Sequence, residues 1–288
     1  MQSHGGIDFH RPETLSEALE IKAERPDAVP LAGGTDLMVA INFRQTRPAA
    51  VLDLTAVPEL GEWAPDDGRV RVGAGVTYTR LIEELGDRLP GLAIASRTVG
   101  SPQIRNRGTV GGNLATASPA GDGLPPLYTS GAVVELASAR GSRRVPVDEF
   151  ITGPKRTAIA PDELIAAFVL PAATGPQQFA KVGTRNAMVI AVCSVSLAIW
   201  PEWRRVAVCV GSAGPTPLVA TEAEEYIAGA LDWDGGKPIA DEALARFGEL
   251  VGAAARPIDD VRGTAAYRSR AVGVLGRRTL QWAWSEYA

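Results

Sequence analysis

Apolar residues in the first 170 positions recur with helical spacing in some segments and with strand spacing in others. The clearest helical signal lies before Pro26, where Thr14 or Ser16 can cap an amphipathic helix. Its apolar face consists of Leu15, Ala18, Leu19 and Ala23. Further helices are predicted at 37–43, 79–85 and 92–99, and strands at 28–31, 51–54, 69–72, 132–136, 145–147 and 164–170. Helices and strands therefore interleave along this part of the chain.

The last third of the sequence has a different pattern, with two long apolar strands followed by three helices. The strands are predicted at 189–200 and 206–211, and the helices at 221–230, 241–255 and 264–284. Residues 171–178 have the composition of a linker. We therefore predict an α+β protein with its main domain boundary between residues 175 and 176.

Composition and charge narrow the function classes. The 288 residues are 45% hydrophobic and 22% charged, which is enough for a large buried core. The formal net charge of -4 disfavours nucleic acid as a partner. The cluster of Arg140, Arg143 and Arg144 is interpreted as a solvated hairpin turn. No secretory signal and no apolar run of about 20 residues is present, so we expect a cytoplasmic protein that is not an integral membrane protein.

The sequence contains few cysteine and histidine residues that could bind a metal ion. The only cysteines are Cys193 and Cys209, which are far apart and lie in apolar stretches, so both are expected to be buried small residues. The only histidines, His4 and His10, lie near the N-terminus. We therefore expect no metal site in the chain.

Two glycine-rich segments contain most of the candidate chemistry. One is SPQIRNRGTVGGNLATASPAGD at 101–122, and the other is PLAGGTDL at 30–37. Glycine lacks the Cβ that would keep a ligand away from the backbone, and it leaves N–H donors free for phosphate. Two Gly-Gly loops about 80 residues apart therefore predict two sides of one phosphate site.

Neither segment matches the common nucleotide-binding loops. The pattern G-x-G-x-x-G begins at Gly73-Ala74-Gly75, but Tyr78 stands in the place of its last glycine. The P-loop pattern G-x-x-x-x-G-K-[ST] does not occur. The sequence thus predicts a phosphate site of another type.

Six sequence blocks, in order, carry a resemblance to a known family. They are AGGTDL (32–37), QIRNRGTVGGN (103–113), SPAGD (118–122), DEL (162–164), FAKVGTRN (179–186) and AAYRSR (265–270). With these blocks the chain resembles the FAD-binding medium subunit of molybdenum hydroxylases, the xanthine dehydrogenase and carbon monoxide dehydrogenase family. The resemblance implies a PCMH-type, vanillyl-alcohol oxidase-like FAD-binding domain at 1–175, with subdomains at about 1–55 and 56–175. A C-terminal α+β domain at 176–288 would follow it.

The resemblance also implies which residues bind FAD, with the two Gly-Gly loops clasping its diphosphate. The first loop would supply Leu31, Ala32, Gly33, Gly34, Thr35, Asp36 and Leu37. The second would supply Thr109, Gly111, Gly112, Asn113 and Thr116, with Val99, Gly100, Ile104 and Gly108 near them. Asp122 would accept hydrogen bonds from the nucleotide sugar. Leu164 and Ile165 would contact the adenine side, and Lys181 would reach the flavin from the C-terminal domain.

Several of these residues have a simpler interpretation when each is taken alone. Thr35-Asp36 could be a helix N-cap. Asp122 could be a turn residue. Lys181 could be a surface lysine, and only its place in the FAKVGTRN block favours a flavin role.

The family implies a heteromeric enzyme in which this chain transfers electrons. A large subunit would contain the molybdenum cofactor, and a small subunit would contain two [2Fe–2S] clusters whose electrons the FAD of this chain passes to an external acceptor. The expected assembly is a dimer of heterotrimers. Carbon monoxide dehydrogenase medium subunits usually show His-Ser where this chain has Thr35-Asp36, which favours a purine or other N-heterocycle as the substrate.

Three other interpretations stay open at this point. The chain could be the medium subunit of an aerobic carbon monoxide dehydrogenase. It could also be a stand-alone flavin oxidoreductase of the same fold, although neither cysteine nor histidine lies in a block that would tether a flavin. A scaffold subunit that has lost FAD would be expected to have degraded glycine loops, and both loops are intact.

Overall fold

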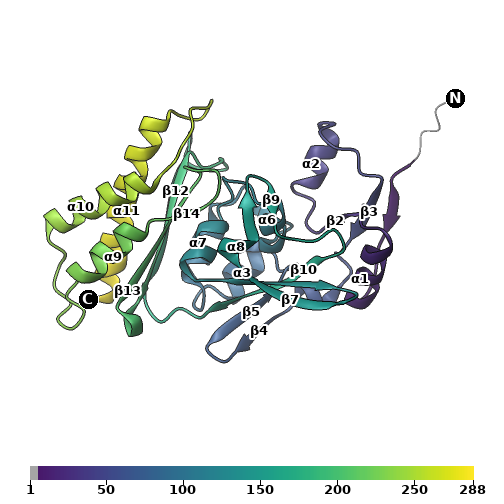
Figure 1. The fold of residues 1–288 in the computed structure, drawn as a ribbon, viewed down its shortest axis with the longest axis horizontal. Coiled ribbons are helices and arrows are strands. Elements are labelled where there is room, and N and C mark those ends of the chain that lie inside the picture. Colours follow the sequence, from purple (N-terminus) through teal and green to yellow (C-terminus); the bar gives the residue numbers. More distant parts are fainter. Residues whose placement is uncertain (1–5) are drawn as a thin grey trace.

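The computed structural model describes residues 6–288, and His4 lies outside that range. The elements form three consecutive units along the longest axis of the molecule (Figure 1). Each unit has a sheet of its own, and helices are distributed among all three. The predicted α+β class is confirmed.

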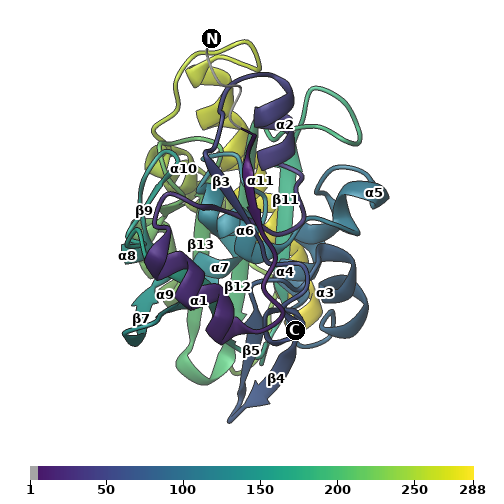
Figure 2. The ribbon, with the colours of Figure 1, turned by 90° about the vertical axis from the view of Figure 1, so that its right-hand side faces the viewer.

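The first unit is a small parallel sheet with the strand order β1-β3-β2. Its elements are β1 (Asp8–His10), α1 (Leu15–Glu24), β2 (Val29–Leu31), α2 (Leu37–Asn42) and β3 (Ala50–Asp53). Thr14, not Ser16, caps α1, because its side chain accepts a hydrogen bond from the Glu17 amide. The first glycine loop joins β2 to α2, which has no buried residue and lies at the edge of the molecule (Figure 2).

The second unit is an antiparallel sheet with the strand order β4-β5-β10-β6-β7. Its strands are β4 (Trp63–Asp66), β5 (Arg69–Gly73), β6 (Val133–Ser138), β7 (Gly141–Pro146) and β10 (Leu164–Pro171). A two-stranded ribbon consists of β8 (Ile151–Gly153) and β9 (Arg156–Thr157), and the 3-10 helix η1 spans Pro58–Gly61. The helices are α3 (Tyr78–Glu84), α4 (Pro90–Arg97), α5 (Pro102–Arg105), α6 (Val110–Thr116), α7 (Leu124–Thr129) and α8 (Val147–Phe150).

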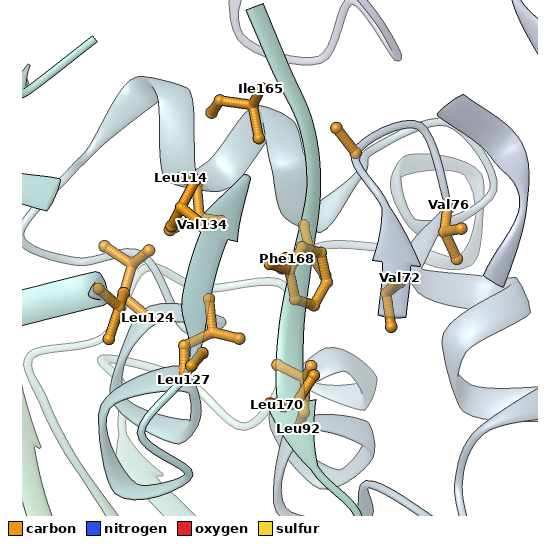
Figure 3. Close-up of a cluster of buried hydrophobic side chains, with 14 of the residues drawn as sticks. Val72, Val76, Leu92, Leu114, Leu124, Leu127, Val134, Ile165, Phe168 and Leu170 are labelled. Carbon is orange, nitrogen blue, oxygen red and sulfur yellow. The ribbon is translucent and has the colours of Figure 1, made fainter. Parts of the chain in front are cut away.

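The central strand β10 anchors the largest core cluster (Figure 3). Phe168 lies between Val72 of β5 and Val134 of β6, with which it is in register. Helices α4, α6 and α7 add Leu92, Leu114, Leu124 and Leu127 to the same cluster. Truncating a fully buried aromatic side chain such as Phe168 typically costs about 3–5 kcal/mol, so this core holds the sheet and the loop-bearing helices together.

The third unit is a sheet with the order β11-β12-β13-β14, covered by three helices. Its strands are β11 (Gln177–Val182), β12 (Cys193–Trp200), β13 (Arg205–Gly211) and β14 (Leu218–Val219). The 3-10 helix η2 spans Pro201–Trp203, and the helices are α9 (Thr221–Ala230), α10 (Asp241–Ala254) and α11 (Ala265–Tyr287). Cys193 and Cys209 are buried and free, as predicted.

The structure corrects several predicted boundaries. Strand β12 begins at Cys193 and not at 189, since its partner β11 ends at Val182, the residue that pairs with Cys193. Val147 opens α8 and does not end β7. The predicted linker at 171–178 already contains the start of β11. The Arg140, Arg143 and Arg144 cluster does lie at a hairpin, where the arginines pair with Asp162, Glu163 and Glu135.

Helices α10 and α11 pack closely where they cross, at Gly248 and Gly273. A Cβ on Gly273 would lie 2.6 Å from the Gly248 carbonyl oxygen. We expect Gly273→Ala to destabilise the chain by about 1–3 kcal/mol, because overpacking forces the helices apart. Thermal unfolding followed by circular dichroism measures this. The matched control is Gly229→Ala in α9, whose Cβ would meet no heavy atom of residues 6–288 within 4 Å and should stabilise by about 0.5–1 kcal/mol. Equal melting temperatures for wild type and Gly273→Ala would contradict the close crossing.

Acid sensitivity is expected in the third unit, at the buried Arg268. Its guanidinium donates to the Ser212 carbonyl (3.1 Å) and to the Asp260 carboxylate. The Arg262 amide, together with Arg268 and Arg262 side chains, lowers the pKa of Asp260 from 3.8 to about 2. A lowered pKa in the folded state adds stability above pH 4, and that stability is lost as the pH falls toward 2.

The measurement is urea unfolding of wild type and Asp260→Asn at pH 6, 4 and 3. We expect the wild type to be the more stable at pH 6 and the difference to shrink by pH 3. A difference that stays constant across this range would show that the ionised carboxylate does not stabilise the unit.

Candidate functional site

The first glycine loop follows β2 directly, and its backbone conformation favours glycine at one position. Gly34 has a φ of +76°, a left-handed conformation that favours glycine. Asp36 occupies the N-cap position of α2, but its side chain makes no capping hydrogen bond. The N-cap interpretation therefore does not explain why an acid stands at this position.

The second glycine loop is stabilised by a capped helix. Thr109 is the N-cap of α6, and its hydroxyl accepts a hydrogen bond from the Gly112 amide (2.9 Å). The backbone before it is fixed to α3, since the Tyr78 amide donates to the Gly108 carbonyl (3.0 Å). The start of the loop is therefore held by two hydrogen bonds.

The structure brings the two glycine loops into direct contact. A Cβ on Gly33 would overlap the carbonyl oxygen of Arg107, so the two backbones touch at this point. The Thr116 hydroxyl of the second loop donates to the Asp36 carboxylate of the first (2.8 Å). Residues about 80 positions apart thus form one continuous backbone surface, as the phosphate-site interpretation requires.

The two adjacent glycines of the second loop have different surroundings. A Cβ on Gly111 would overlap Ala74 of the turn after β5, so this glycine is required for close packing. A Cβ on Gly112 would meet only the Thr109 hydroxyl, at 3.1 Å, among residues 6–288. Gly112 therefore faces the open side of the loop, where a ligand can approach the backbone.

Asp122 and Lys181 form a buried ion pair between the second and third units. The Lys181 Nζ lies 2.6 Å from the Asp122 Oδ2, and the two side chains are 10% and 9% exposed. Lys181 also donates to the carbonyls of Thr98 (2.9 Å) and Val189 (3.1 Å). Burial raises the pKa of the Asp122 carboxyl, while Lys181 and the Thr98 hydroxyl lower it in part.

Two buried oxygens next to the loops have no partner among the described residues. They are Asn113 Oδ1 and Asp122 Oδ1. The glycines on either side of Asp122 pack closely against the Asn113 amide, because a Cβ on Gly121 or Gly123 would lie within 3 Å of that side chain. A buried acceptor without a partner costs free energy, and ligand hydroxyl donors would relieve that cost at both atoms.

The remaining residues expected to bind FAD lie at different depths. Val99, Gly100 and Ile104 belong to the turn around α5, where Gly100 has a φ of +47° and Arg105 donates to the carbonyls of residues 99 and 100. Leu164 and Ile165 begin β10 with buried side chains that belong to the hydrophobic cores of the first and second units, respectively. A contact of either residue with the adenine side remains a prediction.

Tyr78 is a residue of this region that the sequence did not suggest. Its side chain is 3% exposed and lies beside Gly108 and Gly123. Burial raises its pKa, and the carboxylates of Asp122 and Asp36 raise it further. The available signal was the run Gly73-Ala74-Gly75 shortly before it, which forms the turn that supports Gly111.

Within residues 6–288, no group of three His, Cys, Asp or Glu side chains is arranged to hold a metal ion. None of the helices in the same range combines the length and the apolar character needed to cross a membrane.

Comparison with known proteins decides the family. The family model described as "FAD binding domain in molybdopterin dehydrogenase" matches residues 5–173, and "CO dehydrogenase flavoprotein C-terminal domain" matches residues 178–283. The chain belongs to the FAD-binding medium subunits of molybdenum hydroxylases. The predicted family and its cofactor FAD are confirmed, as is the order of an FAD-binding domain and a C-terminal domain.

Individual relatives of this flavin subunit cover most or all of its length. It is 34% identical over 233 residues to the xanthine dehydrogenase FAD-binding subunit of Escherichia coli O157:H7, covering 75% of this chain and 77% of that one. It is 32% identical to the carbon monoxide dehydrogenase medium chain of Afipia carboxidovorans, covering 96% of both. Carbon monoxide dehydrogenase from Hydrogenophaga pseudoflava has a matching solved chain, with a TM-score of 0.88, 28% identity and 98% of both chains covered.

The geometry of the glycine loops fits FAD. The joined loops offer a backbone surface without side chains to a diphosphate. The Asn113 and Asp122 oxygens, which lack a partner among residues 6–288, suit the hydroxyl donors of a sugar or ribityl chain. The flavin subunit thus has acceptors and open backbone in one place, in the pattern that an extended dinucleotide needs.

We expect Gly112→Val to lower FAD retention by about tenfold or more while the chain still folds. The added side chain would occupy the open face of the loop, and a tenfold loss corresponds to only about 1.4 kcal/mol of binding. Flavin absorbance per chain after gel filtration measures this, with thermal unfolding as the test of folding. Gly61→Val is the control, because its Cβ would meet no described atom within 4 Å and it lies in η1. Full flavin content in Gly112→Val would refute this loop as part of the FAD site.

Proposed function

We propose that this chain is the electron-transfer flavin subunit of a heteromeric molybdenum hydroxylase. Its partners would be a large subunit with the molybdenum cofactor and a small subunit with two [2Fe–2S] clusters, assembled as a dimer of heterotrimers. The observation that supports this most strongly is the contact between the two glycine loops, beside buried acceptors that have no partner in the described part of the chain. The family membership supports the electron-transfer role.

The proposed FAD site uses the residues that the resemblance named. The loops at 31–37 and 108–116 would hold the diphosphate through backbone contacts, and Asp122 would accept from a sugar hydroxyl. Bound FAD would supply the redox chemistry, taking electrons from the small subunit and delivering them to an external acceptor. The chain's own residues bind the cofactor, orient it and exclude water from it.

We also propose that the complex hydroxylates a purine or another N-heterocycle. Support comes from Thr35-Asp36 in the first loop and from the similarity to a xanthine dehydrogenase subunit. The similarity to a carbon monoxide dehydrogenase chain supports carbon monoxide as the alternative substrate. We further propose a cytoplasmic location, the FAD-binding domain at 1–175 and the C-terminal domain at 176–288.

Co-expression tests the proposed function directly. The chain is purified alone and together with the large and small subunits, and FAD, molybdenum and iron are quantified. We expect FAD in the lone chain, and oxidation of xanthine or another N-heterocycle only by the complex that contains molybdenum and iron.

Three results would contradict parts of the proposal. Substrate turnover by the isolated chain would favour a stand-alone flavin oxidoreductase. Oxidation of carbon monoxide, but of no N-heterocycle, would select the alternative substrate. A chain that binds no FAD, either alone or in the complex, would refute the flavin role itself.

A further inference from the structure

The three N–H donors of the Lys181 ammonium all have acceptors within the protein. Lys181 lies on β11 of the third unit, and its Nζ reaches the second unit. An ammonium has three donors, and three acceptors surround this one: the Asp122 carboxylate and the carbonyls of Thr98 and Val189. Within the described residues no donor of Lys181 is left over for a ligand.

The Asp122 carboxylate is engaged on one oxygen only. Its Oδ2 accepts from Lys181 (2.6 Å) and from the Thr98 hydroxyl (3.3 Å). Its Oδ1 is buried and has no partner within residues 6–288. The ion pair therefore fixes the orientation of the carboxylate. Its Oδ1 is left to accept a hydrogen bond from a ligand.

The position of Lys181 relative to Asp122 is set by contacts between the second and third units. In the β11–β12 pair Lys181 is opposite Ser194. The Ser212 amide donates to the Pro119 carbonyl (3.0 Å), three residues before Asp122. Thr129 of α7 and Ser196 of β12 share a buried hydrogen bond (3.0 Å). Docking of the third unit thus places Lys181 against Asp122.

We propose that Lys181 is a positioning residue, which acts on FAD through Asp122 and couples FAD retention to docking of the third unit. Lys181 keeps the buried carboxylate ionised and turned so that its Oδ1 accepts from a hydroxyl of FAD. This role differs from a direct contact with the flavin. It rests on the proposed FAD site.

Removing the cation would make FAD binding sensitive to pH. The polar groups that face Asp122 are the Lys181 ammonium, the Thr98 hydroxyl and the Tyr78 side chain, whose pKa is raised by burial and further by Asp122. Burial already raises the pKa of Asp122, and Lys181 opposes that shift. Without Lys181 the carboxyl takes up a proton more readily as the pH falls, and a protonated carboxyl is a poorer acceptor.

A double-mutant cycle on the full chain tests the coupling. The variants are Lys181→Met, Asp122→Asn and the double variant, and FAD affinity is measured by titration of the apo-protein with flavin fluorescence as the signal. We expect each single variant to lose about tenfold or more in FAD affinity, because each weakens the charge-assisted hydrogen bond from an FAD hydroxyl to residue 122. The double variant should bind FAD no more weakly than Asp122→Asn.

The pH series gives a second readout, and a surface lysine gives the control. Between pH 8 and pH 6, FAD affinity of Lys181→Met should fall more steeply than that of the wild type. Lys237→Met removes an exposed lysine of the same unit, whose side chain is 81% exposed, and should leave affinity unchanged at every pH.

The outcomes separate this inference from the proposed FAD site. Additive losses in the cycle, or a double variant weaker than Asp122→Asn, would show that Lys181 contacts FAD directly and would overturn the inference alone. Wild-type affinity in Lys181→Met would overturn it as well. If Lys181→Met fails to fold, the FAD affinity of the double variant can still be compared with that of Asp122→Asn. The double variant buries no unpaired charge, so it is expected to fold. A wild-type chain that binds no FAD would refute the FAD site and the inference together.

Discussion

The contact between the two glycine loops is the constraint on which the site depends. At Gly33 the backbone touches the carbonyl of Arg107, and any side chain there would force the loops apart. The hydrogen bond between Asp36 and Thr116 spans the same junction. The rest of the second unit serves this contact, because the core around Phe168 fixes the helices from which the second loop projects. A ligand surface made of backbone tolerates little movement, so it needs a well-packed scaffold.

The three helices and the two long strands of the third unit could be predicted closely, while its strands β11 and β14 and the short helices around the site could not. Helix α9 spans Thr221–Ala230, the same residues that its apolar spacing predicted. Helices α6 and α7 were missed, since Gly111-Gly112 and Pro125-Pro126 suggest loops. Proline is tolerated in the first turn of a helix, and glycine in α6 is required by close packing. Both exceptions arise from contacts that a local pattern does not contain.

The pairing of the glycine loops was predictable because both consist of residue types that serve phosphate. The ion pair of Asp122 and Lys181 was not, since the two residues are far apart in sequence and each is ordinary in its own segment. Tyr78 was missed for a related reason: a tyrosine in a helix looks like a core residue until its neighbours are known. The sequence named Asp122 and Lys181 as candidate site residues, and the structure added the contact between them.

Leu164 has a consequence for the order in which the chain folds during synthesis. Its side chain completes the core of the first unit beside Leu52 and Leu60, although it belongs to β10 of the second sheet. A nascent chain exposes residues from the N-terminus onward, so the unit that bears the first glycine loop lacks part of its core until residue 164 leaves the ribosome. The two glycine loops are therefore expected to reach their final arrangement together, after β10 has been synthesised. An early fragment ending before β10 would expose apolar surface and would be a natural substrate for chaperones.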